Sequence, residues 1–159
     1  MNCPNGHGKM REKKLAEYEA APILGMRSVV VKDLPAFVCP ACGETIIAGE
    51  VLDKVHTNLL VLVLTSDYVL SGEEVRFIRK ALRLSQSEFA DRLGVHRTTV
   101  TRWETGEVPV EAPVSIAIRA LAAVPRVGSL NADQRKAVVS SFERPPLVGK
   151  HDVYNVGVA

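Results

Sequence analysis

The sequence predicts an α+β protein of two small domains, a β-rich amino-terminal domain and an all-α carboxy-terminal bundle of about five helices, joined by a linker helix. Alternating apolar residues, a valine run that ends at Val31, and scattered prolines and glycines indicate strands within residues 1 to about 47. Apolar residues at helical spacing predict a helix from Glu50 to about Leu64. Ser71 and Glu74 then stand at capping-box spacing, which indicates that a second set of helices begins there.

Start and stop signals define the helices of this second set. The first is predicted from Glu73 to Leu82, the second from Gln86 to Leu93, and the third from His96 to Glu104. Gly94 supplies the left-handed residue that a tight turn between the second and third helices needs. The remaining predictions are a helix that includes Val114 to Leu121, a short helix from Ala132 to Phe142 capped by Asn131, and a mobile tail after Pro146.

The composition indicates a packed globular protein, because 47% of the 159 residues are hydrophobic. The first 15 residues are polar and basic, so we expect no secretory signal and a cytoplasmic location. The longest apolar run, Leu59 to Leu64, is much shorter than the roughly 20 residues of a membrane span, so we expect no membrane association. We recognise no nucleophile with an adjacent base and no phosphate-binding loop, so we do not expect an enzyme.

The positive charge of the chain is concentrated in one segment. Residues 1 to 50 hold six basic and six acidic residues, whereas residues 76 to 103 hold seven basic residues against two acidic ones. A local basic surface is typical of nucleic-acid binding. We therefore expect the second domain, and not the first, to approach DNA.

The third helix of the second domain has one polar and one apolar face. At 100° per residue, its polar side chains fall within an arc of roughly 140°, and they are Arg97, Thr98, Thr101 and Arg102. Val100 and Trp103 fall on the opposite side. Arginine can bond the major-groove edge of guanine, and a threonine methyl can touch the thymine methyl. Gln86 begins the preceding helix, where it could reach a DNA phosphate.

These residues resemble the Xre/λ-repressor class of helix-turn-helix domains. The resemblance covers about 50 positions and rests on Gln86, Ala90, Gly94, Val100 and the run from Arg102 to Gly106. It implies a protein that binds double-stranded DNA at a palindromic operator. The alternative without a DNA-binding function is a helical bundle that only contacts other proteins.

The three cysteines indicate a metal site. Cys39 and Cys42 stand two residues apart before a glycine, in the pattern of a zinc knuckle, and Cys3 is followed four residues later by His7. We expect these four side chains to bind one Zn²⁺. The ion should be structural rather than catalytic, because a fully coordinated ion leaves no position for a substrate. Two alternatives stay open: a redox-active Cys39 and Cys42 pair, and His56 in place of His7 as the fourth ligand.

An amino-terminal zinc finger, a helix and an Xre-type domain together resemble the MqsA-type antitoxins, over residues 1 to about 124. The stretch from Phe37 to Glu44 is similar to the second knuckle of that family, and Cys3-Pro4 to its first. The chain departs from the family at Gly6, where a cysteine is usual, and His7 follows.

The resemblance implies an antitoxin of a type II pair, a dimer that represses its own operon and neutralises a small ribonuclease toxin through the zinc domain. It implies base contacts by Thr98 and Arg102, and toxin contact by β-sheet extension on strands within Lys9 to Val31. The alternative is a stand-alone Xre-type regulator with a structural or sensing zinc site.

The predicted domains are residues 1–66, a zinc-binding and toxin-binding domain with the linker helix, residues 67–124, the helix-turn-helix domain, and residues 125–159, a short helix and tail. The run from Leu59 to Leu64 has two open interpretations, an interface with another chain or burial in its own. A dimer contact is expected on the last helix of the DNA-binding domain, at Val114, Ile116, Ile118 and Leu121.

Overall fold

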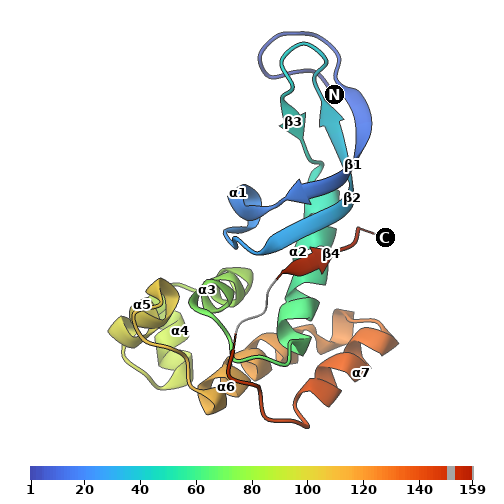
Figure 1. Cartoon of the computed structure of the whole chain (residues 1–159). Coiled ribbons are helices and arrows are strands. Elements are labelled where there is room, and N and C mark those ends of the chain that lie inside the picture. The colour runs from blue at the N-terminus through green and yellow to red at the C-terminus, as the bar shows by residue number, and fades with distance from the viewer. Residues whose placement is uncertain (150–152, 159) are drawn as a thin grey trace.

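The computed structural model describes residues 1–149 and 153–158 and confirms the α+β class (Figure 1). Strands gather at the amino-terminal end of the molecule, the carboxy-terminal helices lie at the other end, and one long helix runs between them. Among the described residues, no helix combines the length and the apolar character that crossing a membrane requires.

The amino-terminal part is built on a long hairpin. Strand β1, Arg11–Glu19, pairs antiparallel with β2, Val29–Val38, and a short helix, α1 at Ala21–Leu24, lies in the connection. Strand β3, Thr45–Ile46, pairs with the end of β2. Because β2 is the central strand, the outer edge of β1 pairs with no described strand.

The hairpin bends at Asp33, which the sequence analysis did not predict. Asp33 has a φ of 54°, and the ladder between the strands omits the pair of Ala16 and Asp33. The buried side chains of β2 are Val29 and Val31 before this point and Leu34 and Ala36 after it, so the buried face changes from odd to even positions. Because of this change, Val29, Val31 and Leu34 all belong to the main core, whereas Phe37, near the end of β2, packs against Cys3 and Cys39.

Helix α2, Gly49–Thr65, is the predicted linker helix and lies at the centre of the molecule. Within its apolar run, Leu59, Leu60, Val63 and Leu64 are buried among residues of the same chain, and Leu62 is 36% exposed. Burial in its own chain therefore accounts for most of this run. One continuous core joins the sheet, α2 and the carboxy-terminal helices. Helix α2 therefore contributes to the core of both parts and is not a free linker.

The carboxy-terminal helices begin and end within one or two residues of the predicted positions. They are α3 at Gly72–Ala81, α4 at Gln86–Leu93, α5 at Arg97–Thr105, α6 at Ala112–Ala123 and α7 at Ala132–Ser141, with a 3₁₀ helix at Val124–Ser129. Capping boxes at Ser71, Ser85 and Asn131 start three of them, because each side chain accepts from the third helical amide and the residue there returns the bond.

The prediction of a mobile tail is wrong for the described residues 153–158. Tyr154–Val156 forms strand β4, which pairs parallel with Val29–Val31 of β2. The side chains of Tyr154 and Val156 are 3% and 0% exposed. Their alternation with polar Asn155 is the period of a half-buried strand, a signal that the nearby prolines obscured. Residues 150–152 and 159 of the predicted tail lie outside the described residues.

Candidate DNA-binding surface and metal site

Helix α5, the third helix of the predicted helix-turn-helix unit, presents the predicted polar face. Gly94, with a φ of 66°, makes the tight turn after α4, and His96 caps α5 by accepting from the Thr98 amide. Val100 and Trp103 are buried in the core, whereas Arg97, Thr98 and Arg102 are exposed and Thr101 is half-buried. The helix is therefore held by its apolar face and leaves its polar face open.

A buried carboxylate behind this face was not predicted. The Glu104 side chain is 2% exposed and accepts from Arg79 Nε at 2.6 Å and Nη2 at 3.1 Å, and from Gln86 Nε2 at 3.0 Å. Burial opposes ionisation of Glu104, but the hydrogen bonds from Arg79 and Gln86 and the charges of Arg79 and Arg76 outweigh it and lower its pKa. Glu104 thus ties together the three helices of the helix-turn-helix unit.

Two of the predicted DNA-binding residues, Gln86 and Thr101, belong to this hydrogen-bond network. Gln86 donates its amide to Glu104, and its Oε1 accepts from Thr101 Oγ1 at 3.3 Å. Both side chains therefore belong to a protein network in the absence of DNA. Arg79 also forms an ion pair with Glu104. The positive charge available for DNA between residues 76 and 103 is therefore smaller than the count of basic residues indicates.

The other three predicted residues are more accessible. Arg102 Nε donates to Glu107 at 2.9 Å, but both side chains are more than half exposed and surface pairs of this kind are weak. Thr98 Oγ1 lies 2.9 Å from His96 Nδ1. Arg97, Thr98 and Arg102 thus form the accessible part of the polar face.

The structure brings the four predicted metal ligands together. One ligand atom from each of Cys3, His7, Cys39 and Cys42 lies within 4.8 Å of all the others. Cys3 Sγ is 3.7 Å from Cys42 Sγ and 3.8 Å from His7 Nδ1. With Zn–S bonds of about 2.3 Å, a tetrahedral site requires sulfurs about 3.8 Å apart. The cluster can therefore hold one metal ion. His56 is not part of it, because its ring stacks on Phe77 with centroids 6.3 Å apart.

Two backbone turns hold the ligands. The Cys3 amide donates to Gly8 O at 2.8 Å, and the Cys39 amide donates to Glu44 O at 2.9 Å. The backbone amide of Glu44, followed by the Asn5 side chain, lowers the pKa of the Cys42 thiol to about 6, whereas burial raises the pKa of Cys3. Cys42 thus favours the thiolate form that binds metals.

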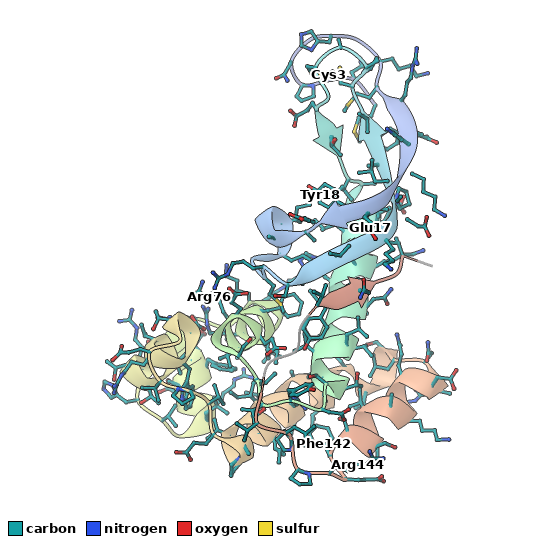
Figure 2. All side chains as sticks on the ribbon, in the orientation of Figure 1. Cys3, Glu17, Tyr18, Arg76, Phe142 and Arg144 are labelled. Carbon is teal, nitrogen blue, oxygen red and sulfur yellow. The ribbon has the colours of Figure 1, made fainter. Side chains whose placement is uncertain are left out.

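This end of the molecule has almost no apolar core of its own. Cys3, Met10 and Cys39 form a small buried cluster, separate from the main core, against which Phe37 and Ile46 pack. Figure 2 shows Cys3 at the upper tip of the molecule, far from the helix-turn-helix unit. A segment with so little apolar burial requires another source of stability, which a bound metal would supply.

Comparison with known proteins identifies the carboxy-terminal unit. A family model described as helix-turn-helix matches residues 75–123, which run from the first turn of α3 to the end of α6. A search of curated proteins finds no match to the chain. The class that fold and match define is therefore a DNA-binding protein. More particularly, it is a regulator with an Xre-type helix-turn-helix domain and a Cys/His cluster that could bind a metal.

Proposed function

We propose that the protein is the antitoxin of a type II toxin–antitoxin pair, and that it represses its own operon as a dimer bound to a palindromic operator. In this proposal the amino-terminal domain neutralises a small ribonuclease toxin and performs no catalytic step. The observation that carries the proposal is the separation of two sites, with the Cys/His cluster and hairpin at one end and the recognition helix at the other. The charge-balanced amino-terminal end has no electrostatic reason to approach DNA.

The proposal assigns Zn²⁺ to the Cys/His cluster. Three thiolates and one imidazole are a donor set that zinc prefers, and four protein ligands complete a tetrahedral shell. The ion would have a structural role, since it joins the turn at Cys3 to the turn at Cys39 and Cys42.

The free edge of the hairpin supports strand addition as the mode of toxin binding. On β2, the side away from β1 already pairs with β3 and β4, whereas no described strand pairs with the outer edge of β1. A toxin strand would add to Arg11–Glu19, where backbone groups supply affinity and alternating side chains supply selectivity.

Two point variants of the full chain test this division of labour. Cys39→Ser should abolish binding to the product of a neighbouring toxin gene and retain binding to a duplex from upstream of the chain's own gene. Arg102→Ala should do the reverse. Calorimetry measures the first interaction and gel shift the second. Toxin binding that survives in Cys39→Ser, or is lost only in Arg102→Ala, would overturn the assignment.

A specific observation favours the alternative of a stand-alone regulator that senses metal or redox state. Cys42 is exposed, and its thiol has a pKa of about 6, so it is reactive at neutral pH when no metal binds it. In that case no neighbouring gene product binds the protein, and chelation or mild oxidation changes its affinity for the upstream duplex.

A further inference from the structure

The first turn of α3 lies against the carboxy-terminal end of the recognition helix. A Cβ atom added at Gly72 would lie 2.2 Å from the carbonyl oxygen of Trp103 and 3.1 Å from that of Glu104. Only glycine permits this approach of two backbones. Arg76, one turn later, donates from Nη2 to the same Glu104 carbonyl at 2.9 Å. A shift of the first turn of α3 therefore presses directly on the end of α5.

The same turn is held from the other side by β4 and the α1–β2 connection. Tyr154 Oη donates to Glu74 Oε1, and the second oxygen of that carboxylate accepts from the Ser71 amide at 2.6 Å. Glu74 and Tyr154 are both almost fully buried. Glu73 accepts from Arg27 Nε at 2.5 Å and from the Arg27 amide at 3.0 Å. Two adjacent carboxylates thus join α3 to the sheet end of the molecule.

The sheet fixes the position of Tyr154. Its amide donates to Ser28 O at 2.8 Å, and β4 continues in register with Val29–Val31. Three residues later, Gly157 O accepts from the Asn58 side chain of α2 at 2.8 Å. The contacts of β4 with β2 and α2 therefore fix the position of the Tyr154 hydroxyl, which in turn contacts the helix-turn-helix unit.

We propose that Tyr154 is a positioning residue for DNA binding, and that the first turn of α3 transmits the position of the sheet to the recognition helix. The route runs from β2 through β4 and Tyr154 to Glu74, and from Gly72 to the carbonyls of Trp103 and Glu104. Anything that moves the sheet edge at Val29–Val31 then changes the presentation of Arg97 and Arg102. The proposal rests on the DNA-binding role of α5 and does not require a toxin.

Trp103 provides the readout, since it is the only tryptophan and lies on α5 at the point of contact. Tyr154→Phe keeps the ring in the core and removes only the hydroxyl. Val138→Ala, on α7, creates a core defect outside this route. Tyr18→Phe makes the same chemical change on β1. We expect Tyr154→Phe to shift Trp103 emission and to speed amide exchange at the end of α5. We expect Val138→Ala and Tyr18→Phe to leave both unchanged.

DNA binding gives the second measurement. Tyr154→Phe should weaken binding to the upstream duplex roughly fivefold, at the lower end of typical coupling between linked sites. If the wild-type chain does not prefer that duplex over a scrambled one, autorepression fails and the Trp103 measurements still decide the inference. Unchanged emission and exchange in Tyr154→Phe, or equal changes in Val138→Ala, would show that β4 only adds stability.

Discussion

Arg79 and Glu104 form a buried, two-pronged ion pair that joins α3 to the recognition helix, with N–O distances of 2.6 Å and 3.1 Å. The same carboxylate receives the Gln86 amide from α4. A bidentate pair of this kind fixes geometry as well as adding energy. Side chains from α3, α4 and α5 therefore meet at one buried carboxylate.

Removal of this charge should be costly. Glu104→Gln keeps the shape of the side chain but leaves the Arg79 guanidinium buried without a counter-charge, so the free energy of unfolding should fall by about 3 kcal/mol. Urea unfolding measures the loss. Glu107→Gln is the matched control, because its partner Arg102 is exposed, and its effect should stay below about 1 kcal/mol. Similar losses in the two variants would contradict the structural role of Glu104.

Acid should weaken the fold through the same group. The pKa of Glu104 is lower in the folded protein than its ordinary value. Its contribution to stability is therefore complete above the pKa of an unfolded glutamate, about 4.3, and is lost as the pH falls through the lower folded value. Denaturant titrations from pH 6 to about 3 should show a smaller decline for Glu104→Gln than for wild type. Equal declines would assign the acid sensitivity to other carboxylates, such as Glu73 and Glu88, whose pKa values are also lowered.

The Cys/His cluster should bind about one zinc ion per chain, measurable by elemental analysis. Chelation should open the amino-terminal turns and the small cluster of Cys3, Met10 and Cys39, because that cluster is separate from the main core. Amide exchange should then rise around these turns and stay low in α4 and α5. Fully protected turns in metal-free protein would refute a structural metal.

The exposed arginines of α5 should read DNA. Arg102→Ala should cost about 1–3 kcal/mol at a specific site and much less on random DNA. Glu107→Gln should strengthen binding to both DNAs slightly, because it removes a negative charge beside Arg102. Titrations at several salt concentrations separate the two effects. Equal losses on both DNAs in Arg102→Ala would assign this residue to a phosphate contact.

Local signals made most of the helices predictable. Ser85, Glu88 and Gly94 specify the beginning and end of α4 within ten residues of chain, and the structure has the predicted bounds. The Cys/His cluster was largely predictable in the same way, because knuckle spacing singles out Cys39 and Cys42 and leaves Cys3 with His7 or His56 as partners. The structure brings His7, and not His56, to the cluster.

The features that the sequence did not predict depend on partners far apart in the chain. Arg79 pairs with Glu104, and Tyr154 pairs with Glu74, although each pair is far apart in the sequence. The periodicity of apolar residues does not predict such contacts. Buried Arg119 is similar, since its guanidinium donates to the carbonyls of Ser66 and Tyr68 beyond the end of α2. A cut after residue 66 would therefore remove β4 from its sheet and separate Arg119 from one of its two acceptors, Ser66 O.

The pairing of β4 with β2 has a consequence for how the protein is made. The ribosome produces Val29–Val31 long before Tyr154–Val156, the strand that covers this edge. At normal translation speed the delay is on the order of ten seconds. During that interval the backbone groups of Val29–Val31 that later pair with β4 are exposed on the nascent chain. An exposed strand edge of this kind can pair with strands of other chains. The completed molecule hides this edge, so binding by chaperones, and aggregation when chaperones are scarce, should be concentrated in the period of synthesis.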